Sequence, residues 1–254
     1  MRKVSAYVIT KNEEKHIKEC VESVLFADEV VLVDSGSSDA TVEIAKKLGC
    51  RVVGHKFESF GAQRNFALTQ CSNDWVIALD ADERVSPELK NEILSELANP
   101  SGGEVFIAPR KSKFINKWIL HSGWYPDYRH PILFDKTKAR YKDQLVHEDI
   151  EYRGKKSYFK GDILHYPYDS IKQFIKKSDL YTDFKAQEMF ERGKKFKAAN
   201  LIINPSAMFV KMFFTKKGFL DGVTGFVLAV LYSCIYTSMK YIKLWELEQK
   251  VKQK

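Results

Sequence analysis

Several patterns that would assign this chain of 254 residues to a common class are missing from its sequence. The four cysteines form no C-x-x-C pair, which argues against a disulfide framework or a zinc site and favours reduced thiols in a cytoplasmic protein. No G-x-G-x-x-G follows the first strand-like segment, so a Rossmann dehydrogenase is not expected. Internal repeats and low-complexity tracts are also absent.

Long apolar runs are missing as well. The run at residues 4–9 is too short for a secretory signal and leads directly into KNEEK, so we do not expect secretion. The apolar core of a C-terminal segment, residues 223–236, spans about 14 residues, whereas a bilayer-spanning helix needs about 20. The wider segment 206–247 has lysines close by and is better explained as a membrane-surface helix. A hydrophobic helix packed on the rest of the protein is the alternative.

The net charge of +8 is placed unevenly along the chain. Residues 1–169 contain 25 Lys and Arg against 26 Asp and Glu, whereas residues 170–254 contain 16 against 7. All the surplus positive charge therefore lies in the last third. Such asymmetry favours an anionic partner there, which could be a membrane surface, a nucleic acid or an anionic substrate.

The first hundred residues alternate between strand-like and helix-like patterns. The expected strands are residues 4–10, 29–34, 51–55 and 74–80, and the expected helices are 12–26, 41–48, 61–70 and 87–97. This alternation predicts an α/β fold with a mostly parallel sheet flanked by helices. Further strands are expected at 104–110, 131–135 and 139–143, and a helix at 170–193. We therefore expect one domain at 1–168 and a helical, basic, amphipathic region at 169–254.

The most informative stretch is DWVIALDADER, residues 74–84. A short apolar strand ends there in two aspartates, and the alternation of side chains predicts that Asp80 and Asp82 leave it on the same side. Paired carboxylates repel each other unless a cation lies between them, and hard oxygen ligands suit Mg²⁺ or Mn²⁺ holding a diphosphate. A lone D-x-D is often a solvated loop. Here the preceding strand and Pro87, which opens a helix, place it in a strand-to-helix loop, where ligands bind in open α/β sheets.

Further polar residues lie where predicted strands end or helices begin. Glu13 follows the first strand, Asp34 ends the second, and residues 35–37 permit a tight turn near a ligand. Arg64 lies at the start of a helix, where its guanidinium could face a diphosphate. Each has an ordinary explanation as a helix cap, a first-turn residue or a surface residue. Their arrangement is more informative, because Asp34 and the D-x-D both fall at the expected ligand-binding edge.

Taken in order, these motifs resemble those of inverting family 2 glycosyltransferases with the GT-A fold. The matching residues cover nearly the whole chain: TKNEE (10–14), VDSGSSDAT (33–41), GAQRNFAL (61–68), LDADERVSPEL (79–89), GWYPDYR (123–129), LVHEDI (145–150), KKGFLDG (216–222) and KYIKLWE (240–246). The chain is most similar to bacterial transferases that add glucose or a related hexose to the lipopolysaccharide inner core. The Q-x-x-R-W motif of the family's processive synthases is absent, so the resemblance implies transfer of a single sugar.

The resemblance implies how a UDP-sugar donor would be held. Asp34 would contact the uracil or the ribose, and Thr10 and Glu13 would line the same pocket. Arg64 would help to position the nucleotide and its diphosphate. Asp80 would face the ribose and the sugar.

The resemblance also implies a metal ion and a catalytic base. Asp82 would ligate Mg²⁺ or Mn²⁺, with Asp80 and His147 as further candidates, and the metal would neutralise charge on the UDP leaving group. An inverting transfer needs a base that deprotonates the acceptor hydroxyl. The VHED segment matches the region where the family keeps that carboxylate, so we expect Glu148 to be the base, with Asp149 as the alternative.

The aromatic loop and the basic C-terminal region point to the acceptor. Aromatic faces stack on sugar rings, so Trp124, Tyr125, Asp127 and Arg129 are candidates for sugar binding, with core packing as the alternative. We expect a lipid-linked glycan acceptor such as a lipopolysaccharide core, an anionic membrane partner and no nucleic-acid partner. The expected location is cytoplasmic, peripheral on the inner face of the cell membrane.

Two other classes of function compete with this hypothesis. A nucleotidyltransferase that makes nucleotide-sugars shares the α/β fold and paired aspartates, but usually has a glycine-rich loop after its first strand, where this chain has TKNEEKH. A non-enzymatic module that binds membranes or nucleic acid would explain the basic last third alone. It leaves the acidic pairs at the strand ends unexplained.

Overall fold

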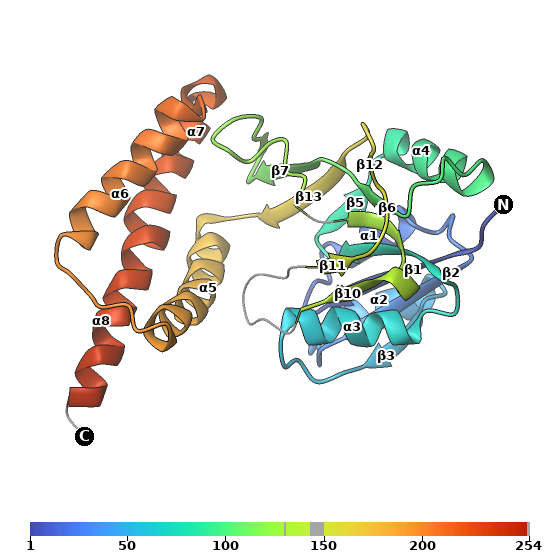
Figure 1. Ribbon diagram of the computed structural model, residues 1–254, viewed down its shortest axis with the longest axis horizontal. Coiled ribbons are helices and arrows are strands. Elements are labelled where there is room, and N and C mark those ends of the chain that lie inside the picture. The colour runs from blue at the N-terminus through green and yellow to red at the C-terminus, as the bar shows by residue number, and fades with distance from the viewer. Residues whose placement is uncertain (130, 143–149, 253–254) are drawn as a thin grey trace. The chain divides into compact units, whose positions relative to one another are not determined.

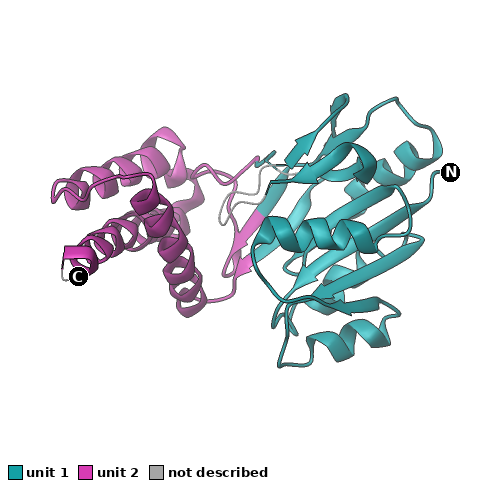
Figure 2. Cartoon of the chain, turned by 60° about the horizontal axis from the view of Figure 1, so that its bottom comes forward, with its two compact units in different colours: residues 1–111, 127–166 teal, residues 112–126, 167–254 magenta. Residues whose placement is uncertain are grey.

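The computed structural model of the chain describes residues 1–129, 131–142 and 150–252 (Figure 1). They form two compact units (Figure 2). Residues 1–111 and 127–166 make the first unit, and residues 112–126 and 167–254 make the second. The expected division after residue 168 groups the segment 112–126 with the first domain, whereas the structure groups it with the C-terminal residues.

The first unit is built on a seven-stranded sheet with the order β12-β6-β9-β4-β1-β2-β3. Its strands are β1 (Val4–Thr10), β2 (Glu29–Asp34), β3 (Arg51–Gly54), β4 (Trp75–Asp80), β6 (Val105–Ile107), β9 (Pro131–Asp135) and β12 (Lys156–Tyr158). β1 pairs in parallel with β2 and β4, β2 with β3, and β12 with β6. β9 is antiparallel to both of its neighbours. The predicted α/β fold with a mostly parallel sheet is confirmed.

Helices cover both faces of this sheet, so the side chains on both faces of its central strands are buried. All seven residues of β1 are buried. Its residues Ala6 and Val8 pack in a cluster with α1 (Ile17–Glu22) and α4 (Pro87–Ala98). Tyr7 belongs to the apolar cluster on the opposite face of the sheet, which includes residues of α3 (Phe60–Gln70). A strand buried on both faces is typical of parallel sheets.

The helix expected at residues 12–26 is shorter than its pattern predicts. Only α1 is helical there, because the residues before it bond to the loop that leads to α2 (Thr41–Lys47). The backbone N–H of Asn12 donates to Ser37 Oγ at 2.8 Å, and that of Glu13 donates to Thr41 Oγ1 at 2.8 Å. Asn12 has a φ of 55°, which takes it out of the helical region. These bonds hold the segment after β1 against the segment after β2.

Glu29 is the first residue of β2, at the end opposite to Asp34, and its carboxylate bonds to residues of neighbouring segments. Its Oε2 accepts hydrogen bonds from Ser5 Oγ at 2.7 Å and from the backbone N–H of Ser72 at 2.8 Å. Its Oε1 accepts from Arg51 Nη2 at 2.9 Å. Burial raises the pKa of Glu29, but the hydrogen bonds from Ser72, Ser5 and Arg51 outweigh it and lower the pKa to about 2.

We expect Glu29→Gln to lower the free energy of unfolding at pH 7 by about 2 kcal/mol. The full pKa shift would correspond to about 3 kcal/mol, and solvent screening of this partly exposed carboxyl reduces the effect. The pKa is depressed in the folded state, so this stabilisation is present above the unfolded value of 4.5 and is lost as the pH falls toward about 2. Urea unfolding of both proteins at pH 7, 5, 4 and 3 checks this. A difference that stays constant below pH 4.5 would contradict it.

The second unit is mainly helical. It contains α5 (Ile171–Glu191), α6 (Asn200–Val210), α7 (Gly222–Val230) and α8 (Ser238–Lys252), with π-helical turns at Lys211–Thr215 and Leu231–Thr237. The strands β7 (Arg110–Phe114), whose first two residues belong to the first unit, and β8 (Lys117–Trp118) pair in an antiparallel hairpin. Ala186 and Met189 of α5 pack with Leu244 of α8 in a small apolar core. The helical, basic C-terminal segment predicted from the sequence is confirmed.

One helical stretch of the described residues is long and apolar enough to cross a membrane by length and composition alone. It runs from Gly218 to Lys252 and includes α7 and α8. A core helix of a soluble protein passes the same test, so the stretch is weak evidence of membrane insertion.

Candidate functional site

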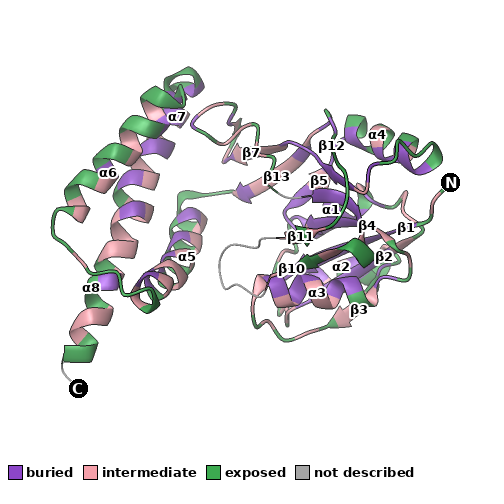
Figure 3. Cartoon of the chain, viewed as in Figure 1, coloured by how far each residue is buried: buried purple, intermediate pink, exposed green. Residues whose placement is uncertain are grey.

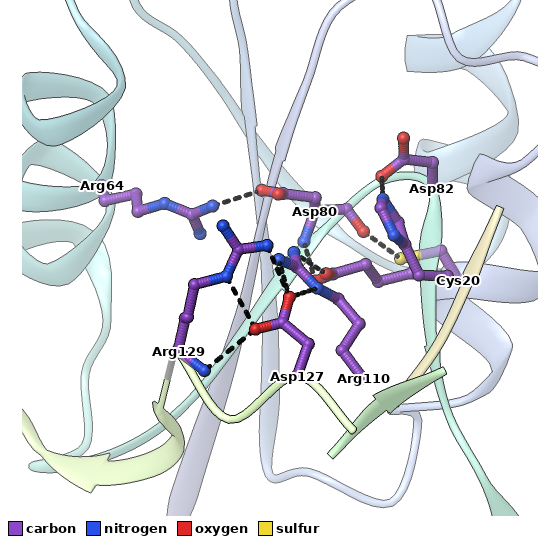
Figure 4. A network of polar contacts seen from close by, with 9 residues as sticks. Cys20, Arg64, Asp80, Asp82, Arg110, Asp127 and Arg129 are labelled. Carbon is purple, nitrogen blue, oxygen red and sulfur yellow. Dashed lines mark hydrogen bonds and ion pairs between the residues drawn. The ribbon is translucent and has the colours of Figure 1, made fainter. Parts of the chain in front are cut away.

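The D-x-D motif lies at the end of β4, at the predicted edge of the sheet. Asp80 is the last residue of the strand, and the chain turns at Ala81 and Asp82 before β5 (Glu83–Val85). Asp80 bonds to Arg64 (Figure 4), whereas the Asp82 carboxylate lies near His165.

Arg64 lies in the first turns of α3 and is 8% exposed. Its Nη2 donates to Asp80 Oδ1 at 2.7 Å, and its guanidinium lies 5.6 Å from the centroid of the Tyr141 ring. Tyr141 in turn shares a hydrogen bond of 2.9 Å with the buried Tyr7 hydroxyl. The guanidinium is therefore held by a carboxylate and an aromatic face near the carboxyl end of β4. This is the region where the sequence predicts a diphosphate-binding arginine.

A network of ion pairs that the sequence does not predict lies beside the D-x-D (Figure 4). Glu83 accepts from the backbone N–H of Asp80 at 3.1 Å and from Arg110 Nη1 at 3.0 Å. Arg110 Nη2 also donates to Asp127 Oδ2 at 2.8 Å, and Arg129 Nε donates to Asp127 Oδ1 at 2.7 Å. Arg64, Glu83, Arg110 and Asp127 line one pocket. Glu83 directly follows the motif, which is the one local signal that could have identified it.

The pair predicted for substrate binding, Asp127 and Arg129, is part of this network. Burial raises the pKa of the Asp127 carboxyl, but hydrogen bonds and charge from Arg129 and Arg110 hold it well below its usual range. Asp127 is thus ionised and bonded to two guanidinium groups. The Arg129 side chain is 70% exposed and remains accessible to a ligand.

The acidic residues around the D-x-D fit a divalent cation. Burial and the nearby Asp80 raise the pKa of Glu83 to about 7; Arg110 opposes the rise and Asp82 adds to it. Burial is the largest cause of this rise, and the part that comes from Asp80 and Asp82 reflects negative charge that a cation would offset. Among the described residues no group of three His, Cys, Asp or Glu could hold a metal ion by itself. Mg²⁺ bound to a diphosphate needs only one or two carboxylates, so Asp82 with or without Asp80 is a sufficient protein contribution.

His165 lies next to Asp82, and sequence reasoning missed it. It belongs to β13 (Ile163–Tyr168), which pairs antiparallel with β5. Its Nε2 is 3.7 Å from Asp82 Oδ1, and the backbone N–H of Tyr166 donates to the Asp82 carbonyl at 2.8 Å. β13 therefore holds the Asp82 turn in place.

Thr10 and Asp34 lie side by side at the same edge, paired in register between β1 and β2. The Asp34 carboxylate accepts from the backbone N–H groups of Gly36 and Ser37 at 3.0 and 2.9 Å, and from Ser37 Oγ at 2.5 Å. It therefore organises the loop that follows β2, in which Gly36 has a φ of 84° that glycine adopts readily. The Thr10 hydroxyl is buried and has no hydrogen-bond partner within the described part of the chain.

The structure brings together the predicted donor-site residues Thr10, Asp34, Arg64 and Asp80 at the carboxyl ends of β1, β2 and β4 with the start of α3. Glu13 follows in the segment bonded to the loop after β2. His147, Glu148 and Asp149 lie outside the described residues.

The two aromatic candidates fall in the second unit. Trp124 packs edge-to-face on Phe114 and on Tyr232, with ring centroids 6.1 and 5.9 Å apart. It belongs to the partly buried residues around the apolar core of that unit. These contacts favour the core-packing alternative for Trp124. Tyr125 is half-buried and precedes a cis peptide bond to Pro126.

Residues 5–158 match the model of glycosyl transferase family 2. An uncharacterized glycosyltransferase of Rickettsia typhi is 31% identical over 265 residues, which cover 98% of this chain and 89% of the relative. The lipopolysaccharide core biosynthesis glycosyltransferase LpsC of Rhizobium meliloti is 29% identical over 254 residues, covering 96% of this chain and 92% of LpsC.

A solved structure is similar over a smaller part of the chain. Glucosyl-3-phosphoglycerate synthase of Mycobacterium tuberculosis, in complex with Mn²⁺, uridine diphosphate and phosphoglyceric acid, is 25% identical with a TM-score of 0.38. The match covers 42% of this chain and 43% of the synthase. A likeness at that TM-score carries no conclusion about the ligands of this chain.

Proposed function

The chain belongs to glycosyl transferase family 2, and from that premise we propose that it moves one hexose, glucose, from a UDP-sugar to a lipopolysaccharide core or a similar lipid-linked glycan. The observation that carries the proposal is the juxtaposition of Asp80, Asp82 and Arg64 at the strand edge that also holds Asp34. The similarity to a transferase named for lipopolysaccharide core biosynthesis, over almost its full length, supports the class of acceptor.

Residues at the carboxyl ends of the strands would each bind a different part of the UDP-sugar donor. The loop after β2, organised by Asp34, would receive the nucleoside together with the Thr10 hydroxyl, which has no hydrogen-bond partner among the described residues. Arg64 would provide positive charge for the diphosphate while its bond to Asp80 keeps that carboxylate oriented toward the ribose and sugar. Asp82 would hold Mg²⁺ or Mn²⁺, which would neutralise the charge of the departing diphosphate.

The transfer itself needs one proton acceptor from the protein. Glu148, or Asp149 in its place, would take the proton of the acceptor hydroxyl as its oxygen attacks the anomeric carbon from the side opposite the diphosphate. The new C–O bond forms while the bond from that carbon to the phosphate oxygen breaks. UDP leaves with the bonding electrons, and the configuration of the sugar is inverted.

A donor screen tests the proposal. UDP-glucose, UDP-galactose, UDP-N-acetylhexosamines and ADP-heptose are incubated with the protein and Mg²⁺ or Mn²⁺, with and without a lipid A–core acceptor. We expect UDP release from UDP-glucose that depends on the acceptor. Pyrophosphate release from a nucleoside triphosphate would instead identify a nucleotidyltransferase. The absence of nucleotide binding, together with salt-sensitive binding to RNA, would favour a binding module.

The helical unit supports a location on the inner face of the cell membrane. Along α6 and α7, exposed positions recur (Figure 3), and several of them carry large apolar side chains. Ile202 is 72% exposed, Ile203 63% and Val223 80%. Apolar side chains exposed on helices with lysines nearby are typical of elements that lie in a membrane surface.

We expect the triple replacement of Ile202, Ile203 and Val223 with serine to weaken binding to anionic vesicles at least tenfold, since burying one such side chain contributes about 1.5–3 kcal/mol. Vesicle co-sedimentation checks this. Leu25→Ser is the matched control, because Leu25 is 50% exposed and lies in the first unit. Undiminished binding of the triple variant, with a circular dichroism spectrum like that of the wild type, would contradict the proposed membrane face.

A further inference from the structure

The second unit contains an open cavity of about 360 Å³ whose walls are strongly cationic. It is formed by the C-terminal part of α5, the segment that joins α5 to α6, the start of α6 and one turn of α8. Six cationic side chains and a single carboxylate line it: Lys185, Arg192, Lys194, Lys195, Lys197 and Lys240, with Glu188. Asn200, Tyr241 and Met189 complete the lining.

Most of this positive charge is not neutralised by carboxylates of the described residues. Glu188 is shared by Lys185 Nζ, at 2.7 Å, and Arg192 Nη2, at 2.9 Å. The remaining four lysines of the lining have no carboxylate partner within the described part of the chain.

Neighbouring carboxylates of the same helices are already engaged. Glu248 of α8 accepts from the backbone N–H of Phe196 at 2.8 Å. Asp179 and Asp183 of α5 both bind Lys243, each at 2.7 Å. The cavity therefore keeps its positive charge for a ligand from outside the unit.

Lys240 lies close enough to other cationic side chains of the cavity to feel their charge. Burial lowers the pKa of Lys240, and the charges of Lys185 and Lys194 lower it further. A multivalent anion would relieve the repulsion among the lysines.

We propose that this cavity binds a phosphate monoester or a diphosphate group. Lysine is a common phosphate ligand because its ammonium is a compact point charge with three donors. The amide of Asn200 and the hydroxyl of Tyr241 add neutral donors in the lining. The cavity is far larger than one phosphate, so the group would be carried by a larger molecule, either a lipid headgroup or a soluble phosphorylated compound. The site lies wholly within the second unit and does not depend on the proposed donor site.

Calorimetric titration of the full chain with inorganic pyrophosphate tests the site. EDTA is present so that metal-dependent diphosphate binding at the D-x-D does not contribute. We expect the double variant Lys194→Gln/Lys240→Gln to weaken pyrophosphate binding at least tenfold. Lys172→Gln/Lys176→Gln is the matched control, because both lysines are exposed residues of α5 outside the cavity. Lys240→Arg keeps the charge and should retain most of the affinity.

Vesicles identify the source of the phosphate. At matched surface charge, preferential binding to phosphatidic acid over phosphatidylglycerol, lost in the Lys194→Gln/Lys240→Gln variant, assigns the cavity to a lipid headgroup with a phosphate monoester. Pyrophosphate binding without that preference assigns it to a soluble phosphorylated compound. No pyrophosphate binding by the wild type, or an equal loss in both double variants, would overturn the proposal. Circular dichroism of each variant establishes that the fold is intact.

Discussion

Replacing Asp82 with asparagine is expected to lower kcat for sugar transfer about 10²–10³-fold, the usual loss when one electrostatic contact to a developing charge is removed. The proposed reaction leaves negative charge on the diphosphate, and Asp82 is the proposed metal ligand because Asp80 is already bonded to Arg64. Asparagine keeps the shape of the side chain and one oxygen but removes the charge that holds a divalent cation. The apparent Mg²⁺ or Mn²⁺ concentration for half-maximal activity should rise in parallel.

The fold should survive this substitution. The contact between Asp82 and β13 that positions the turn is made by the Asp82 carbonyl, which accepts from Tyr166 N–H at 2.8 Å. Asp74→Asn is the matched control, since Asp74 is exposed and lies at the opposite end of β4. Steady-state rates are measured over a series of metal concentrations, with thermal unfolding alongside. Full activity of Asp82→Asn in the presence of a chelator would refute the metal role.

The separate roles proposed for the two aspartates agree with their different contacts in the structure. Asp80 bonds to Arg64 at 2.7 Å, so Asp80→Asn removes the carboxylate and also the ion pair that holds the Arg64 guanidinium. We therefore propose that Asp82 chiefly binds the metal and that Asp80 contacts the ribose and the sugar.

Most of the regular structure of the first unit is predictable because local patterns and tertiary packing agree there. The strand expected at residues 4–10 is β1, and the strand expected at 131–135 is β9. Ser86 caps α4 by accepting from Leu89 N–H at 3.2 Å, and Pro87 stands at the first position of that helix. The helix expected at 12–26 is the main failure. Its first residues bond to the loop after β2, a long-range arrangement that a periodic pattern does not contain.

The candidate site is predictable in its location and less so in its contacts. Strand ends identify Asp34 and Asp80 because parallel strands bring their carboxyl ends to one edge. Ion pairs such as Glu83 with Arg110, 27 residues apart, depend on how separate strands approach each other. The role of Trp124 could not be predicted from the sequence either. An aromatic residue in a loop suits sugar stacking and core packing equally, and its contacts with Phe114 and Tyr232 favour the second.

Glu148→Gln is expected to lower kcat by about 10²–10⁴-fold, the usual contribution of a positioned general base. Glutamine keeps the length of the side chain but cannot take the proton of the acceptor hydroxyl. Donor binding does not need this carboxylate, so the dissociation constant for the UDP-sugar and the metal requirement should stay unchanged. The remaining activity should also lose the acidic limb of its pH dependence, which reports the ionisation of the base.

The contrast with Asp82 makes this assignment testable. Asp82→Asn should change the metal requirement together with kcat, whereas Glu148→Gln should change kcat alone, so the two carboxylates are distinguished by which constants move. Asp149→Asn is the matched control, since it removes an adjacent carboxylate from the same segment. If Asp149→Asn shows the larger loss with donor binding intact, the base is Asp149. If neither variant loses more than tenfold in kcat, the proton is taken by a group outside the VHED segment, and the mechanism proposed for this segment is wrong.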